Sequence, residues 1–416
     1  MGRPTDAPTA DPGPSSLSYP GIPESLEPSM ATMQQPTRPR LVTAEFVKLG
    51  LAALAYFFAD GVLLPTVPLY VEGSLGAGDI AVGFAVGSFS VSALVLRPWA
   101  GRAADRSGRR PLMVAGAAIF AVSLAAYGIA DAVPVLMVLR LLTGVGEAFF
   151  FVGAVTAMSD LAPPERRGEA ISLFSLSLYV GIALGPPAGE AIAGRFGFPV
   201  AWLVASGAAV TALLLARRVG DTQEHGLELV TIEKGRLIHP AGLLPGVLLL
   251  TGLWGMAGFL AFVPLYALDH GLPGSGLLLF IFAAIVVVIR GVGARLPDRL
   301  GAVRATRAAL AGITIGLAII GAWRSPAGLV VGTVVLAVGV ALATPAIMTL
   351  ALQDVPATEH GSVMGTVSMS LDLAFGLGPA TLGIVAAATG RGGLFLVAAG
   401  VAALGLTLVV TTQRRG

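Results

Sequence analysis

The sequence predicts an all-α membrane protein with 12 transmembrane helices in two pseudo-symmetric six-helix bundles. Apolar residues make up 55% of the 416 residues and charged residues only 12%, about half the roughly 25% of soluble domains. Apolar stretches of about 20 residues, the length that crosses a bilayer, recur from residue 41 onward. Most of the chain is therefore expected to lie in lipid.

Short polar breaks separate the apolar stretches. We place the spans at residues 43–71, 80–100, 112–130, 133–158, 168–194, 198–216, 238–268, 274–295, 305–323, 326–352, 361–389 and 392–412. Residues 1–40 are rich in Pro, Ser and Thr and contain no apolar run, so we expect a disordered tail and no signal peptide. Met30 and Met33 are alternative starts to Met1.

The positive charges predict the orientation. Of the 26 Lys and Arg residues, 20 lie in the N-terminal tail or on the side of the spans that holds residues 101–110 and 217–237. An excess of Lys and Arg marks the cytoplasmic side of a membrane protein. We therefore expect both termini in the cytoplasm and an inner-membrane location.

The second half of the chain repeats the first. Arg97 corresponds to Arg290, and Gly185-Pro186 to Gly378-Pro379, each at an offset of 193 residues. Internal repeats of this kind are typical of secondary transporters. They predict two six-helix halves, residues 41–216 and 238–412, joined by a charged cytoplasmic linker over 217–237 and followed by a tail over 413–416.

Several function classes are not supported. The chain has no Cys, and its four His lack the spacing of a metal site. Neither a phosphate-binding loop nor a basic run with interleaved aromatic residues occurs. We expect no enzyme activity, no metal, no cofactor and no nucleic-acid partner.

Residues 101–110 carry the most specific motif. They fit every fixed position of the G-x-x-x-D-R-x-G-R-R signature of the major facilitator superfamily, which the chain resembles over 41–412. The resemblance implies two bundles around a central cavity that opens to one side at a time. It also implies a latch that joins the cytoplasmic ends of the halves, formed by Gly101, Asp105, Arg106, Gly108, Arg109 and Arg110. The alternative is a positively charged turn alone.

A second motif lies in the fifth span and resembles that of drug:proton antiporters. Glycines at spacings of four form a flat stripe for close helix packing, and proline bends the helix. The antiporter-like seam consists of Gly181, Gly185, Pro186 and Gly189. Pro65-x-x-Pro68 is similar to a signature of the 12-helix drug-efflux branch. Ordinary membrane-helix packing is the alternative for both.

The fourth span carries Arg140 and Glu147, seven residues apart and so on one helix face. Arg140 begins a sequence similar to the family motif R-x-x-Q-G-x-G, with Thr143 in place of Gln. A charge in hydrocarbon costs several kcal/mol unless it is paired or hydrated. The resemblance places this face on the central cavity, and a structural ion pair is the alternative.

Acidic residues near the middle of the spans are candidates for proton coupling. Burial favours the neutral carboxyl and a nearby Arg favours the carboxylate, so alternating hydration can bind and release a proton. Our order of preference is Asp60, Glu147, Asp372 and then Glu190. Each could instead have a polar packing role.

Aromatic side chains could line an apolar substrate cavity, or simply pack between helices. The candidates in this group are Tyr56, Phe58, Trp254 and Tyr266. Together these features predict a monomeric secondary transporter that exports small apolar or cationic compounds in exchange for protons. The alternatives are a transporter of a polar metabolite, such as a sugar or amino acid, and a non-transporting membrane receptor.

Overall fold

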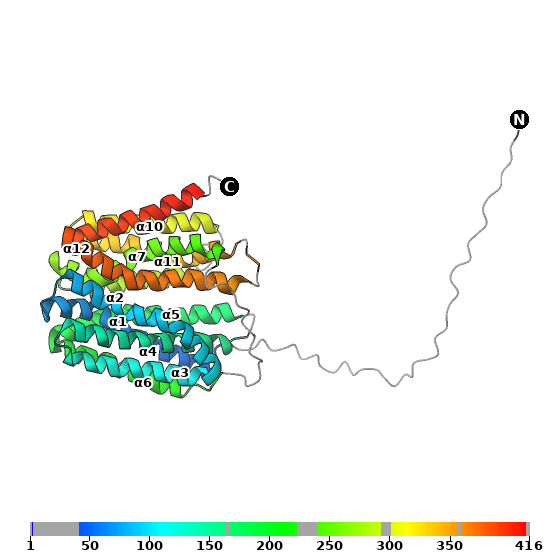
Figure 1. The fold of residues 1–416 in the computed structure, drawn as a ribbon, viewed down its shortest axis with the longest axis horizontal. Coiled ribbons are helices and arrows are strands. Elements are labelled where there is room, and N and C mark those ends of the chain that lie inside the picture. Colours follow the sequence, from blue (N-terminus) through cyan, green and yellow to red (C-terminus); the bar gives the residue numbers. More distant parts are fainter. Residues whose placement is uncertain are drawn as a thin grey trace. The chain divides into compact units, whose positions relative to one another are not determined.

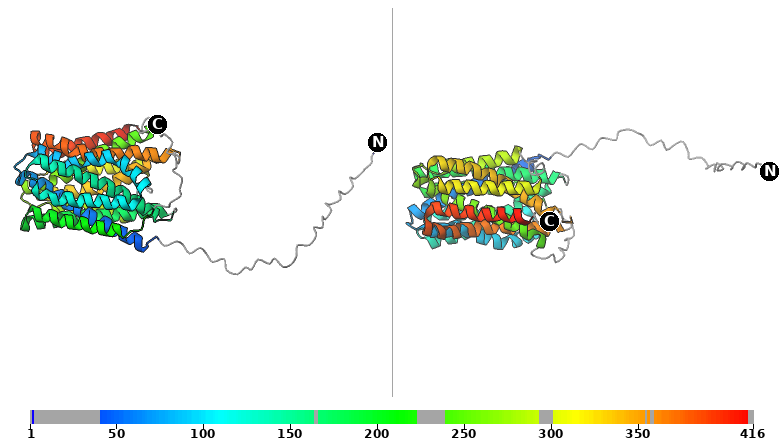
Figure 2. Two further views of the ribbon diagram at one scale, coloured as in Figure 1. Left: turned by 60° about the horizontal axis from the view of Figure 1, so that its bottom comes forward. Right: turned by 90° about the horizontal axis from the view of Figure 1, so that it is seen from above.

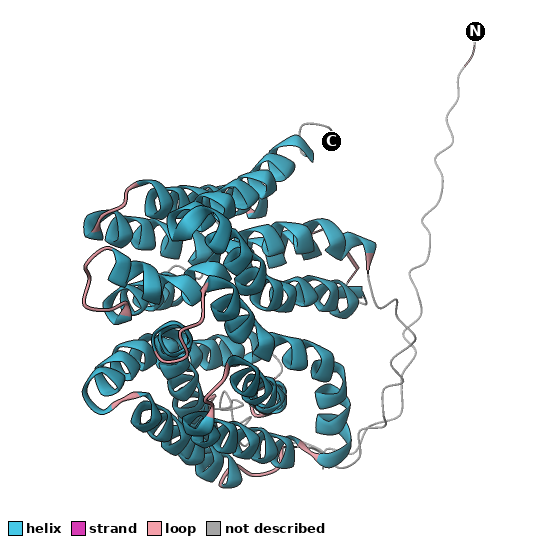
Figure 3. Ribbon diagram, turned by 60° about the vertical axis from the view of Figure 1, so that its left-hand side comes forward, coloured by secondary structure: helices cyan, strands magenta, loops and turns pink. Residues whose placement is uncertain are grey.

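The computed structural model describes residue 2 and residues 41–163, 166–222, 239–292, 301–353, 355–356 and 359–412. Residues Met1–Arg40 and Leu41–Gly416 are two separate units, and the fold described here is that of the second unit. All regular structure within the described ranges is helical (Figure 3). Apart from residue 2, the predicted tails lie outside these ranges, as does most of the predicted linker.

Within the described ranges, eleven α-helices and one short 3-10 helix, η1, follow one another (Figure 1). Their bounds are α1 Ala44–Gly73, α2 Asp79–Ser107, α3 Arg109–Ala126, η1 Tyr127–Ile129, α4 Val133–Asp160, α5 Arg167–Phe196, α6 Phe198–Arg217, α7 Pro240–Asp269, α8 Gly276–Val292, α10 Ala302–Ala322, α11 Pro326–Leu352 and α12 His360–Thr412.

Ten helices among the described residues are long and apolar enough to cross a membrane, and α8 contributes a shorter apolar segment, Gly276–Gly291. The 53-residue α12 is interrupted at Gly390, where φ is +78°. That break coincides with the boundary predicted between residues 389 and 392. The all-α membrane fold is confirmed, and the exact count of twelve spans stays a prediction.

The helices pack in two groups. In the first, α1 contacts α5 and α6, while α4 contacts α2 and α3; in the second, α7, α10 and α11 pack with α12 and α8. The groups meet chiefly where α2 contacts α12 and where α5 contacts α8. Figure 2 shows the helices running side by side.

Glycines with positive φ repeat at the predicted offset. Gly108 and Gly301 have φ values of +90° and +78°, and Gly197 and Gly390 have +88° and +78°. Each pair is 193 residues apart. Side chains disfavour this conformation, so glycine is required at these sharp reversals between helices. The repeat in the sequence is thus also a repeat of the backbone.

Successive helices run in opposite directions. The start of α1 and the end of α6 lie together, because Lys48 Nζ donates to Arg218 O and Gly220 N donates to Glu45 Oε2. We call this side the Ala44 end and the opposite side the Gly73 end. The predicted cytoplasmic side is the Ala44 end.

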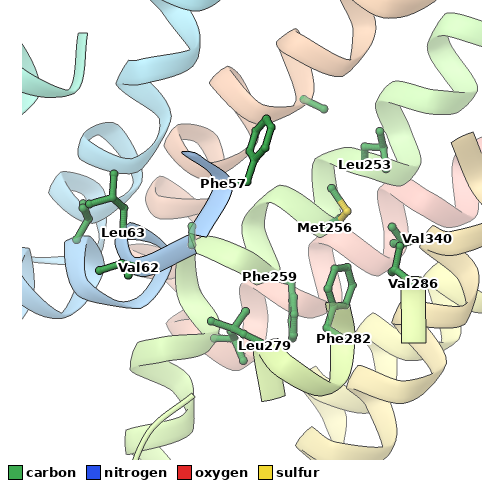
Figure 4. Close-up of a cluster of buried hydrophobic side chains, with 14 of the residues drawn as sticks. Phe57, Val62, Leu63, Leu253, Met256, Phe259, Leu279, Phe282, Val286 and Val340 are labelled. Carbon is green, nitrogen blue, oxygen red and sulfur yellow. The ribbon is translucent and has the colours of Figure 1, made fainter. Parts of the chain in front are cut away.

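The hydrophobic core includes contacts between the two groups of helices. Figure 4 shows Phe57 and Leu63 of α1 in the same cluster as Met256 and Phe259 of α7 and Phe282 of α8. The rings of Phe259 and Phe282 are 5.5 Å apart. This packing places α1 and α7 next to each other in the middle of the molecule.

Candidate functional site

Three charged side chains from both groups of helices meet inside the protein. Arg97 Nη1 of α2 lies 2.9 Å from Asp372 Oδ1 of α12, and Arg97 Nη2 lies 3.9 Å from Glu147 Oε1 of α4. Their side chains are 25%, 8% and 19% exposed, respectively. We call Arg97, Glu147 and Asp372 the central charge cluster. It brings together two of the predicted acidic residues around an arginine that the sequence marked only as part of the repeat.

The two carboxylates are not equivalent. Asp372 is within hydrogen-bonding distance of Arg97, whereas the 3.9 Å separation from Glu147 is too long for a hydrogen bond. Two acidic groups therefore share one guanidinium, and the cluster has one negative charge in excess when both are ionised. Protonation of Glu147 would remove that excess without breaking the shorter ion pair.

Asp60 lies on α1, half-buried and midway along the helix. Its carboxyl group makes neither a hydrogen bond nor an ion pair with any residue in the part of the chain that the structure describes. The charge of Arg140 acts on this carboxyl from a distance, without a direct contact. A carboxylate in hydrocarbon is costly unless it is paired or hydrated, and a role for Asp60 in proton binding stays a prediction.

Arg140 is buried on α4, but it faces α2 rather than Glu147. Its Nε donates to Ala85 O and its Nη2 to Val86 O, at 3.2 and 2.9 Å. Its guanidinium lies over the ring of Phe89, 4.6 Å from the centroid. In the described ranges Arg140 and Glu147 do not form an ion pair, so their shared helix face does not produce direct contact.

Glu190 lies away from the central charge cluster, at the Gly73 end. Its Oε1 accepts from the backbone N–H and the hydroxyl of Ser275, and its Oε2 accepts from Gly276 N at 2.7 Å. A carboxylate at a helix N-terminus is stabilised by the unpaired backbone donors there. Glu190 of α5 therefore caps α8 and joins the two groups of helices.

A second connection at the Gly73 end was not identified from the sequence. Arg391 of α12 forms ion pairs with Asp79 at 2.9 Å, with Asp269 at 3.0 Å and with Glu72. These acids lie at the ends of α2, α7 and α1. The only signal in the sequence is that few cations but several acidic residues fall on this side of the spans.

The latch motif lies at the Ala44 end. Gly108 has φ of +90° at the reversal between α2 and α3, and Arg109 Nε lies 2.9 Å from Asp160 Oδ2 at the end of α4. Arg106 and Arg110 are exposed, and a methyl group on Gly101 would meet nothing within 4 Å. The side chain of Asp105 lies outside the described part of the structure.

The predicted seam packs against α1. A Cβ atom on Gly181 would lie 2.7 Å from Phe58 N, one on Gly185 would lie 2.6 Å from Gly61 Cα, and one on Gly189 would lie 2.9 Å from Val62 O. Pro186 is buried beside Gly185. The glycines thus allow α5 and α1 to approach within the first group of helices.

The aromatic candidates make intramolecular contacts. Tyr56 is fully buried, with its ring 4.1 Å from Phe150 and 4.3 Å from Phe120, while Phe58 is half-buried. Trp254 Nε1 donates to Thr381 Oγ1 at 3.0 Å, and the Tyr266 hydroxyl donates to Ile320 O at 3.3 Å. These contacts favour packing roles for Tyr56 and Tyr266.

Comparison with known families identifies the chain. The family model described as Major Facilitator Superfamily matches residues 49–379. The chain belongs to the major facilitator superfamily. It is 28% identical over 377 residues to an uncharacterized MFS-type transporter of Salmonella typhimurium, covering 87% of this chain and 95% of that protein. It is also 28% identical over 333 residues to multidrug resistance protein 1 of Bacillus subtilis, with coverages of 78% and 85%.

Solved structures of the superfamily have the same fold. The nucleoside transporter NupG matches with a TM-score of 0.72 at 13% identity, covering 89% of this chain and 99% of that one. A bacterial homologue of the human lysosomal transporter Spinster, in an inward-facing and occupied conformation, matches with a TM-score of 0.74 at 14% identity and coverages of 89% and 96%. The protein is thus a membrane-embedded transporter of small molecules and not an enzyme.

Proposed function

We propose that this protein exports small apolar or cationic compounds in exchange for protons, by alternating access. In this proposal the protein is a monomer in the inner membrane, with the Ala44 end and both termini in the cytoplasm. The observation that carries the proposal is the central charge cluster, in which Arg97 joins Asp372 of the other half and lies close to Glu147.

Proton coupling requires a group whose charge affects the contact between the halves. When Glu147 is ionised, it competes with Asp372 for Arg97; when it is protonated, Asp372 has the guanidinium to itself. Protonation therefore favours the state in which α2 and α12 are joined. Asp60 is the second proton-binding group in this proposal, because its carboxyl forms no ion pair within the described residues and the charge of Arg140 acts on it only from a distance.

Alternating access requires contacts that form at one end at a time. At the Gly73 end, Arg391 and Glu190 join the two halves. On the same side a methyl group on Gly83 would overlap the carbonyl oxygen of Pro379, so α2 and α12 touch through their backbones. At the Ala44 end, by contrast, a methyl group on Gly101 would meet nothing within 4 Å. Both features support an assignment of this structure to the cytoplasm-facing state.

The proposed substrate class rests on the apolar interior and on relatives named multidrug resistance proteins. The test uses everted vesicles that contain the protein and a panel of lipophilic cations, neutral dyes and polar metabolites. We expect uptake of the lipophilic compounds, its abolition by an uncoupler, and release of protons from the vesicle lumen. Uptake of a sugar or amino acid alone would replace this substrate class, and proton-independent uptake would overturn the coupling.

A further inference from the structure

Arg290 of α8 occupies the same place in the second half as Arg97 in the first. The two residues are 193 positions apart, which is the offset of the internal repeat. Arg290 lies 14 residues after the start of α8, roughly 21 Å along the helix axis. It is therefore within the thickness of the hydrocarbon core, where an uncompensated cation is costly.

The neighbours of the two arginines also correspond, but their charges do not. Subtracting the offset from Asp372 gives Tyr179, and adding it to Glu147 gives Val340. The structure confirms the first correspondence, because the Arg290 guanidinium lies over the ring of Tyr179 at 4.7 Å. The positions equivalent to both carboxylates of the central charge cluster thus hold uncharged residues in the second copy of the repeat.

Arg290 has no anionic partner in the part of the chain that the structure describes. It forms no ion pair with any residue within the described ranges, and its Nε is buried without a hydrogen-bond acceptor. The aromatic ring of Tyr179 attracts the cation only weakly compared with a carboxylate. The positive charge is left to be neutralised by something other than these side chains.

A cavity of about 420 Å³ lies beside Arg290, between α5, α8 and α11. This volume is in the range of small-molecule sites. Thr344 adds a hydroxyl to its wall, while Leu176 and Met348 contribute apolar surface. Glu169 is the one acidic residue among the described residues of the lining, and Arg166 pairs with it at 2.8 Å.

We propose that this cavity binds an amphipathic anion, with a carboxylate or phosphate group on Arg290 and an apolar chain along α5 and α11. The anion would supply to Arg290 the negative charge that Asp372 supplies to Arg97. A guanidinium binds both groups in a bidentate manner. The ligand could be a membrane lipid headgroup or a free amphiphile, because both present the same chemistry. The proposal does not depend on proton-coupled efflux.

The test is isothermal titration of decyl phosphate and decanoate into the purified protein in maltoside micelles, with decyltrimethylammonium as the cationic counterpart. We expect saturable binding of the anions that is at least tenfold weaker in Arg290→Gln, and an affinity for the cation that does not fall in that variant. Arg307→Gln is the matched control, because Arg307 also has a buried Nε without an acceptor but does not line the cavity. Arg307→Gln should bind the anions with the affinity of the unmodified protein.

Tyr179→Asp provides a second test that keeps the arginine. It restores the carboxylate of the symmetry-related site, so Arg290 becomes internally paired and anion binding should also fall at least tenfold. Unchanged affinity in this variant, or in a folded Arg290→Gln, would overturn the proposal. An equal fall in the affinity for decyltrimethylammonium in Arg290→Gln would overturn it as well.

A separate experiment with lipids distinguishes the two sources of the anion. Native mass spectrometry of protein from nanodiscs containing phosphatidylglycerol should show one retained lipid that is lost in Arg290→Gln if the source is a headgroup. Anion binding in micelles without such retention would assign the site to a free amphiphile. Neither assay involves a proton gradient, so their failure would leave the proposed efflux function untouched.

Discussion

Arg97 of α2 and Asp372 of α12 form an ion pair of 2.9 Å that joins the two halves of the transporter. Such a pair is partly desolvated, and its energetic value depends on both partners being present. Glu147 lies on the other side of the same guanidinium. The contact between the halves is therefore sensitive to the charge of a third group.

We expect Asp372→Asn to weaken the contact between α2 and α12 and to reduce transport at least tenfold, because Arg97 then has only Glu147 as a partner. Asp372→Glu should retain most activity. Initial rates of dye uptake in everted vesicles, at matched protein levels, provide the measurement. Wild-type rates in Asp372→Asn would show that the ion pair is not needed for the cycle.

Neutralising the proposed proton-binding groups should uncouple transport from the gradient. Asp60→Asn and Glu147→Gln keep the size of the side chain but cannot exchange a proton, so uphill efflux should be lost while substrate binding persists. Substrate-induced proton release from purified protein is the direct readout. Glu169→Gln, on an exposed ion pair near the Ala44 end, is the control. Full proton release in both single variants and in the double variant would contradict these assignments.

Gly83→Ala should favour separation of the halves at the Gly73 end. Its methyl group would collide with the carbonyl of Pro379, whereas the methyl group of Gly73→Ala has open space and serves as the control. Because the chain contains no Cys, spin labels at Ser74→Cys and Ala322→Cys can report the distance across this end. We expect a longer mean distance in Gly83→Ala only; an unchanged distribution would show that the close contact does not restrain opening.

Arg391→Gln removes the cation from a group of three acids, Glu72, Asp79 and Asp269. The remaining carboxylates repel each other, so the Gly73 end should open more often, and high salt should reduce this effect by screening. The same pair of spin labels measures the shift. Arg324→Gln, a nearby cation without a described ion pair, should leave the distance unchanged. A closed distribution in Arg391→Gln would assign the closure to Glu190 and the glycine contacts instead.

The spans and reversals were accessible from the sequence because they depend on local patterns. The predicted boundary beside Gly390 and the repeat that relates Gly108 to Gly301 both correspond to positive-φ glycines. Contacts between distant residues were not accessible in this way. Arg391 and Glu72 are on different helices from opposite ends of the sequence, and nothing local to either residue indicates the other.

The candidate site shows the same difference between local patterns, which the sequence reveals, and long-range contacts, which it does not. The acidic residues were identified from their depth in the spans, but the structure was needed to show that Glu147 and Asp372 meet at Arg97, whereas Glu190 caps α8. Helix periodicity predicted that Arg140 and Glu147 share one face of α4. It could not predict that Arg140 would bond to the backbone carbonyls of α2.

Three carboxylates pair with the single guanidinium of Arg391. This has a consequence for the leakage of ions through the protein. A small displacement of α12 would loosen all three ion pairs together, and the unshielded negative charges would then drive the helices further apart. Half-open arrangements are thereby disfavoured relative to fully shut or fully open ones. A carrier that switches abruptly in this manner spends little time as a continuous pore, which preserves the ion gradient of the cell.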